Sequence, residues 1–100
     1  MAQRPKGCNS IVVGADGYVD SDPKNVYALV IIATGATAGD TIALRDGGPT
    51  GTVKVYFEIP AAAGIWPVPL GRYGIEFKTS VFYSEVVTAA DKIHTTVIFG

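Results

Sequence analysis

The stretch from Lys24 to Pro60 constrains the fold most strongly, because it holds two strand-like runs with different hydrophobic patterns. Residues 26–33 are apolar at every position, whereas residues 52–59 alternate between apolar and polar side chains. A strand of the first kind needs cover on both faces, and one of the second kind needs cover on only one. We therefore expect a second sheet or another subunit to cover the remaining face of residues 26–33. In residues 52–59, the side chains expected to face the core are Val53, Val55, Phe57 and Ile59.

The residue types favour strands throughout the chain. Val, Ile and Thr make up 30 of the 100 residues, and β-branched side chains fit a pleated strand better than a helix. Turn sequences at residues 16–17, 21–23 and 46–49 (Asp-Gly-Gly-Pro) separate the runs, and parallel strands would need longer crossovers than this chain allows. The sequence predicts an all-β fold, an antiparallel β-sandwich or small β-barrel of about 7–8 short strands.

The expected strands follow from these runs and turns. They are residues 10–13, 18–20, 26–34, 40–45, 52–59, 74–79, 81–86 and 93–99. Only residues 86–92 are compatible with a helix. Residues 65–69 contain two prolines, which cannot donate to a ladder, so they are expected at a sheet edge or in a loop. Residues 1–9 match no strand or helix pattern and are expected to form a flexible arm before a single domain of residues 10–100.

Charge and hydropathy exclude several classes of partner. Eight basic and nine acidic residues are scattered singly and give a net charge of −1, so we expect no nucleic-acid partner. The longest apolar run is far shorter than the ~18 residues of a spanning helix, and no signal sequence is apparent, so we expect a soluble protein that has no membrane partner and is not exported by a classical signal. Charged residues make up only 17% of the chain, against roughly 25% usually. Apolar surface buried between subunits, in a homo-oligomer, would explain this composition.

Side chains with catalytic or redox potential are few. Cys8 has no second Cys or His at metal spacing. His94 is the only histidine and lies on the polar side of residues 93–99, so we expect it at the surface. Nucleophile-elbow and phosphate-loop motifs are missing from the sequence. We expect neither an enzyme nor a cofactor, although a small β-barrel enzyme that depends on His94 stays open as a third hypothesis.

Carboxylates suggest two kinds of site, a Ca²⁺ loop and a glycosidase pair. The aspartates are Asp16, Asp20 and Asp22, and the glutamates are Glu58, Glu76 and Glu85. The aspartate spacing differs from that of an EF-hand loop, and Asp in turns more often caps backbone N–H groups. Lysines share a strand face with Glu58 and Glu76, which favours solvated ion pairs. We therefore expect neither a metal site nor a catalytic pair.

Aromatic residues are the best candidates for contacts with a partner. Trp66 either anchors a partner or caps an open end of the core. The residues expected at a protein interface are Arg4, Lys6, Tyr56, Trp66 and Tyr73. A carbohydrate-binding or adhesion module is the alternative, with the three aromatic side chains as stacking platforms.

The order of segments from Lys24 to Phe99 resembles small virion proteins of tailed bacteriophages, of the capsid cement, decoration or head-fibre kind. The segments that carry the resemblance are VYALVIIA, ATAGDT, IALRDGG, FEIP, GIEF and ADKIHTTVIF. Residues 1–23 lie outside it. The resemblance implies an all-β, non-enzymatic and often trimeric protein of the virion, made in the host cytoplasm, which stabilises the capsid by bridging its subunits. The partner that it implies is the major capsid protein or another virion protein.

Overall fold

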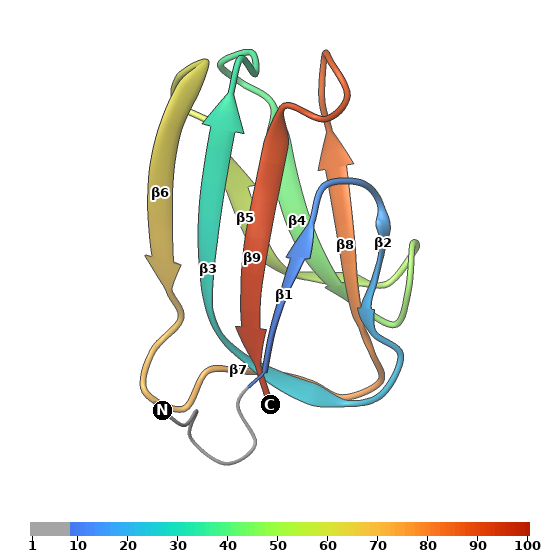
Figure 1. Cartoon of the computed structure of the whole chain (residues 1–100). Coiled ribbons are helices and arrows are strands. Elements are labelled where there is room, and N and C mark those ends of the chain that lie inside the picture. The colour runs from blue at the N-terminus through green and yellow to red at the C-terminus, as the bar shows by residue number, and fades with distance from the viewer. Residues whose placement is uncertain (1–8) are drawn as a thin grey trace.

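The computed structural model describes residues 9–100, which form nine strands in two antiparallel sheets packed face to face (Figure 1). The strands are β1 (Asn9–Val13), β2 (Gly17–Asp20), β3 (Lys24–Thr34), β4 (Thr41–Asp46), β5 (Thr52–Glu58), β6 (Ala63–Pro69), β7 (Ile75–Phe77), β8 (Val81–Val86) and β9 (Ile93–Phe99). The first sheet has the order β1-β9-β3-β6, with β7 also paired to β3, and the second has the order β2-β8-β4-β5. The predicted all-β sandwich is confirmed. The part of the chain described here holds no helix long and apolar enough to cross a membrane.

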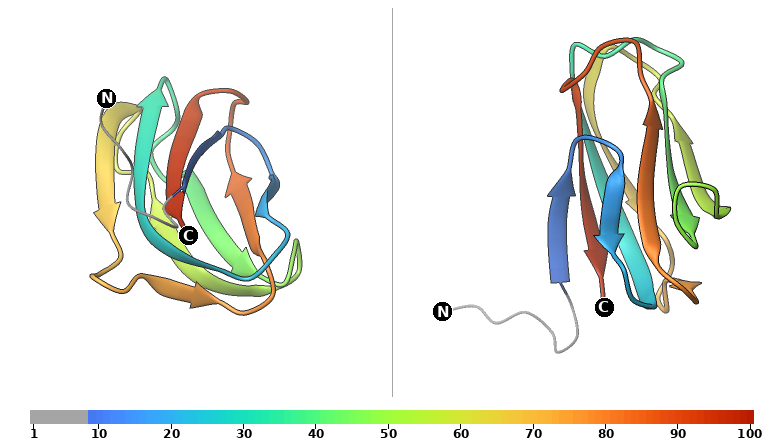
Figure 2. Two further views of the ribbon diagram at one scale, coloured as in Figure 1. Left: turned by 60° about the horizontal axis from the view of Figure 1, so that its bottom comes forward. Right: turned by 90° about the vertical axis from the view of Figure 1, so that its right-hand side faces the viewer.

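Strand β3 organises the first sheet. This eleven-residue strand pairs with β9 along one side, from Val26 to Ala33. Along the other side it pairs with β7 near Lys24–Val26 and with β6 from Ala28 to Thr34. Buried and partly exposed positions alternate along β3 from Leu29 onwards. The second sheet therefore covers only one face of this apolar strand, and the views in Figures 1 and 2 show no strand in front of the other face.

The core lies between the two sheets and is almost wholly apolar. Its largest fully buried side chains come from both layers and include Tyr83, Phe77, Leu29, Ile31, Ile42, Leu44 and Ile93. Stacked sheets lie about 10 Å apart, and inward-facing side chains from both layers fill that space. Alternation along each strand leaves two outer faces, and any interaction surface must be sought on these faces or at the ends of the sandwich.

The expected facing of Val53 is wrong. Leu44 pairs with Val55, but the next residue, Arg45, pairs with Val53, so Lys54 is an extra residue in β5. Such a β-bulge places two residues of one strand opposite one residue of the other, so the alternation of faces is interrupted at the bulge. Val53 is 41% exposed and lies beside Arg45. Val55 and Ile59 are buried, as predicted, and Phe57 packs against the core.

The structure defines three further segments, two that the sequence leaves open and one whose end differs from that of the expected strand. Residues 65–69 belong to β6, an edge strand, which agrees with the limit that their prolines impose. Residues 87–92 form turns and not a helix, and Asp91 has a φ of 62°. Strand β7 ends at Phe77, because the following N–H groups donate to the Asp46 side chain and not to a ladder.

The expected arm and the observed first strand overlap by one residue. Asn9 already pairs with Phe99 in the ladder between β1 and β9. Cys8 and the expected interface residues Arg4 and Lys6 lie outside the described residues. Any truncation meant to leave the sheet intact should therefore stop at residue 8.

Candidate interaction surfaces

The outer face of the first sheet is largely apolar across the four strands β1, β9, β3 and β6. The registers place side chains from β1, β9, β3 and β6 in shared rows on this face. They are Ser10, Val12, His94, Thr96, Ile98, Ala28, Val30, Ile32, Thr34, Ala63, Ile65, Pro67 and Pro69. None of these positions holds Asp, Glu, Lys or Arg. We call this set the apolar face; its most exposed aliphatic side chains are Ile65, at 66%, and Val12, at 62%.

The outer face of the second sheet has a different chemistry. A hollow of about 140 Å³ lies over the small side chain of Ala43 in the central strand β4. Its lining residues are Thr41, Ala43, Arg45, Val53, Tyr56, Ser84, Glu85 and Val86. Tyr56 is 63% exposed and Val86 is 75% exposed. We call this hollow the β4 groove; it combines an aromatic ring, two aliphatic hydroxyl groups and one guanidinium group. Glu85 also lines it, but this residue pairs with the buried Ile42 and its Oε1 accepts a hydrogen bond from the core residue Tyr83.

Arg45 is held in place at this groove by neutral acceptors. Its Nε donates to Ser84 Oγ at 3.3 Å, and its Nη1 donates to the Gly51 carbonyl at 3.1 Å. The second bond reaches the turn between β4 and β5, where Gly47 and Gly48 adopt φ values of 105° and 99°, as the Asp-Gly-Gly-Pro turn predicted. The groove therefore holds an oriented positive charge whose hydrogen bonds go to uncharged oxygen atoms.

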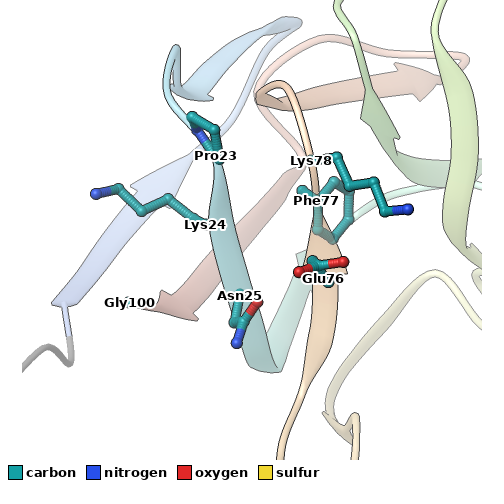
Figure 3. Close-up of a pocket in the computed structure, with 7 residues that line it drawn as sticks. All are labelled: Pro23, Lys24, Asn25, Glu76, Phe77, Lys78 and Gly100. Atoms are coloured by element: carbon teal, nitrogen blue, oxygen red, sulfur yellow. The ribbon is translucent and has the colours of Figure 1, made fainter.

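A larger hollow of about 340 Å³ lies at the end of the sandwich where β3 begins, beside β7 (Figure 3). Lys24, Glu76 and Lys78 line it, and the fully buried Phe77 ring forms part of its wall. In Figure 3 the Lys24 side chain extends away from Glu76 and Lys78. The charged groups thus do not converge on one point, and this hollow has no arrangement that would orient a ligand.

Trp66 faces the core and not a partner surface. Its register partner is Ile31, which is fully buried. The indole ring packs over Gly64, where an added Cβ would lie 2.6 Å from Trp66 Cζ2. Across the sandwich its centroid lies 6.1 Å from that of Phe57 on β5. The geometry favours the second of the two roles considered for Trp66, in which the ring closes an open side of the core.

The other two aromatic candidates lie on separate parts of the surface. Tyr56 lies on the outer face of the second sheet, in the β4 groove. Tyr73 is 79% exposed in the loop between β6 and β7, with the Arg72 guanidinium 5.7 Å from its ring centroid. The structure therefore does not bring Tyr56, Trp66 and Tyr73 together. A stacking platform made of all three is incompatible with this geometry.

A buried polar chain crosses from one sheet to the other. Thr95 Oγ1 on β9 donates to Tyr83 Oη at 3.5 Å, and Tyr83 donates to Glu85 Oε1 at 2.9 Å. Burial raises the pKa of Tyr83, so its hydroxyl stays protonated and able to donate. Burial also raises the pKa of Glu85, although the hydrogen bond from Tyr83 lowers it. This chain is a structural link, and sequence patterns missed it because Tyr83 and Thr95 are on different sheets.

The carboxylates weighed from the sequence do not gather. Asp16 Oδ1 accepts the Glu85 N–H, and Asp20 Oδ1 accepts the Asp22 N–H, so two of the three aspartates cap the backbone. Within residues 9–100, no group of three or more His, Cys, Asp or Glu side chains is placed to hold a metal ion. The three glutamates lie on different strands: Glu58 on β5, Glu76 on β7 and Glu85 on β8.

His94 is exposed, as the alternation predicted. It lies on the apolar face, where its register partner on β3 is Ile32. An added Cβ on Gly14 would lie 3.1 Å from His94 Cδ2, so the imidazole packs against the backbone there. This environment fixes the ring by packing and gives it an apolar neighbourhood.

These features define a two-layer β-sandwich whose outer faces differ in chemistry, one apolar and one with an arginine-lined groove. In comparisons with protein-family models, with curated proteins and with solved structures, the chain matches none.

Proposed function

We propose that this chain is a non-enzymatic structural protein of a phage particle, a cement or decoration protein that stabilises the shell by bridging capsid subunits. The phage assignment comes from the resemblance in residues 24–99. The structural observation that supports an assembly role is the apolar face. Copies of the chain pack together through this face, and the assembled oligomer, for which the resemblance implies three-fold symmetry, attaches to the major capsid protein.

The chemistry of the apolar face favours a second copy as its occupant. A contact between identical copies can bring a charged group close to its own symmetry mate, where like charges repel. The positions of the apolar face hold no Asp, Glu, Lys or Arg, so this contact would carry no such penalty. Apolar side chains of this kind stabilise a contact between copies when they leave water.

The size of the face also fits this role. Four strands about 4.8 Å apart, each contributing about seven residues of 3.3 Å rise, span roughly 400 Å² on one copy. The relief of the side chains increases this area, so two copies together approach the ~1,200 Å² at which specific interfaces begin. A face of this area and composition would account for the low share of charged residues in the chain.

Charge placed on the apolar face tests the oligomer. Ile65→Lys changes a largely exposed side chain, so the fold should survive while a buried lysine would disfavour the interface. Val86→Lys is the matched control, because Val86 is also largely exposed, at 75% against 66% for Ile65, but lies on the second sheet. Light scattering coupled to size-exclusion chromatography should show an oligomer for the wild type and Val86→Lys, and a 10.4-kDa monomer for Ile65→Lys. A monomeric wild-type protein would contradict the role of the face.

Deletion of residues 1–8 tests the proposed contact with the shell. Arg4 and Lys6 are the residues of this segment that we expect at an interface. Because β1 begins at Asn9, the deletion leaves the ladder between β1 and β9 complete. We expect the truncated protein to form the same oligomer but to be lost from purified particles, as measured by mass spectrometry of the virions. Undiminished incorporation would refute the role of residues 1–8.

A carbohydrate-binding or adhesion module is the alternative function. This function would use Trp66, Tyr56 and Tyr73 as stacking platforms, but Trp66 faces the core. Binding of the wild type on a glycan array together with absence from particles would favour the module over the structural role. Presence in particles, located by electron microscopy on the shell, would favour the structural role.

A further inference from the structure

We propose that the β4 groove binds one acidic sugar residue, with its carboxylate on Arg45 and its ring against Tyr56. This site lies on the opposite outer face from the apolar face, and it does not depend on the proposed role in a particle. The groove volume of about 140 Å³ suits a group of the size of a single sugar ring.

The carboxylate part of the proposal comes from the state of Arg45. A guanidinium group carries five N–H donors. Within residues 9–100, the two hydrogen bonds of Arg45 use Nε and one N–H of Nη1, so Nη2 and the second N–H of Nη1 can face a ligand. Two parallel donors of this kind match the two oxygens of a carboxylate. The bonds to Ser84 and Gly51 hold the group before the ligand arrives, which reduces the entropy lost on binding.

The sugar part of the proposal comes from the other groups that line the groove. The Tyr56 ring is 63% exposed and sits on a strand, so it offers a fixed apolar surface for the C–H face of a pyranose. Ser84 Oγ accepts from Arg45, which leaves its own proton free to donate to a ligand oxygen. Thr41 adds a second hydroxyl group to the lining.

An acidic sugar matches the guanidinium group, the aromatic ring and the aliphatic hydroxyl groups of the lining, whereas a neutral sugar would leave Arg45 without a charged partner. An aspartate or glutamate side chain from a peptide would satisfy Arg45 but leave the Tyr56 ring without a flat apolar partner. The floor of the groove, at Ala43, has the smallest side chain of the row, so a ring can approach the sheet between Tyr56 and Ser84. Specific sites commonly combine an apolar surface with a few such placed polar groups.

Titration of the ¹⁵N-labelled full-length protein followed by NMR tests the site. The probes are methyl glucuronide, methyl glucoside and N-acetyl-glutamate amide, each at neutral pH. We expect methyl glucuronide to bind with a dissociation constant of about 1 mM, as befits so small a ligand. Its chemical-shift changes should be confined to β4, β5 and β8 and should saturate, and methyl glucoside should bind at least tenfold more weakly.

Variants then assign the two contacts. Tyr56→Ala should weaken glucuronide binding roughly tenfold, while Tyr56→Phe keeps the ring and the affinity. Arg45→Lys keeps the charge but loses the two parallel N–H donors of the guanidinium group, so the preference for glucuronide over glucoside should shrink. Tyr73→Ala is the control, because it removes an exposed aromatic ring outside the groove. Thermal unfolding of each variant establishes that the fold is kept.

Several outcomes would overturn the proposal. Equal affinity for glucuronide and glucoside would remove the role of Arg45, and shift changes outside the groove would place the ligand elsewhere. Saturable binding by N-acetyl-glutamate amide alone would assign the groove to a peptide. Glucuronide binding that survives Tyr56→Ala unchanged would exclude stacking as its basis.

Discussion

Substitution of Tyr83 by Phe tests the polar link between the sheets. The ring is fully buried, and Phe fills nearly the same volume, so the change removes the hydroxyl group without leaving a large cavity. The hydroxyl donates to Glu85 at 2.9 Å and accepts from Thr95 at 3.5 Å. A hydrogen bond to a charged acceptor contributes about 1.5–3 kcal/mol. Because Glu85 is partly exposed and water can replace the lost donor, we expect the lower end, a loss of about 1.5 kcal/mol at pH 7.

The same substitution should have an effect that depends on pH. The bond from Tyr83 favours the charged form of Glu85 and opposes the rise in the Glu85 pKa that burial causes. Without this bond the pKa of Glu85 rises further. The destabilisation should therefore be full where Glu85 is ionised in the folded protein and should shrink as the pH falls and Glu85 becomes protonated.

Urea denaturation at neutral and acidic pH measures both effects. With a slope of ~1–1.5 kcal/mol per M for a chain of this size, the midpoint at pH 7 should fall by roughly 1 M. Tyr56→Phe is the control, since it removes an exposed hydroxyl group and should change stability by less than about 0.5 kcal/mol. A midpoint for Tyr83→Phe equal to that of the wild type at pH 7, or an equal loss at both pH values, would refute the role of this bond.

Three further substitutions probe other contacts. Gly64→Ala places a Cβ 2.6 Å from the Trp66 ring, so we expect a loss of roughly 1–3 kcal/mol and a red-shifted tryptophan emission; an unchanged spectrum would contradict this packing. Three backbone N–H groups, that of Lys78 foremost, lower the pKa of Asp46 below 3.8. Asp46→Asn should therefore destabilise the protein at neutral pH, and this loss of stability should disappear as the pH falls through the lowered pKa. A loss that is independent of pH would argue against these hydrogen bonds. Burial raises the pKa of Glu85 above 4.5, so wild-type stability should fall as the pH rises from that value, and the pH profile of Glu85→Gln should lack this fall.

The sequence predicted the strands because alternation and turn residues are local signals. Residues 93–99 show the expected burial at every position, and Gly47 and Gly48 form the expected turn. The facing of Val53 could not be predicted, because a β-bulge depends on how Arg45 of the neighbouring strand pairs. For residues 65–69 the sequence does not distinguish an edge strand from a loop, because two prolines obscure the alternation that the side chains of β6 nevertheless show.

The candidate surfaces were less predictable than the fold for a related reason. The β4 groove joins Tyr56 on β5 with Arg45 on β4 and Ser84 on β8, and such a set becomes visible only when the strand order and register are known. Tyr56 was identified from its place on the polar side of a strand, whereas nothing in the local sequence marks Arg45 or Ser84.

The two outer faces together favour one orientation of the molecule in an assembly. The apolar face gains most from being covered, because its exposed aliphatic side chains stabilise a contact when they leave water. The β4 groove lies on the outer face of the other sheet, about one sandwich thickness away, so burial of the apolar face between copies leaves the groove open to solvent. A ligand bound to Arg45 and Tyr56 would then be presented on the outside of the oligomer. Ile65→Lys should accordingly disrupt the oligomer without changing the affinity of the groove for methyl glucuronide. Tyr56→Ala should weaken the binding of methyl glucuronide and leave the oligomer intact.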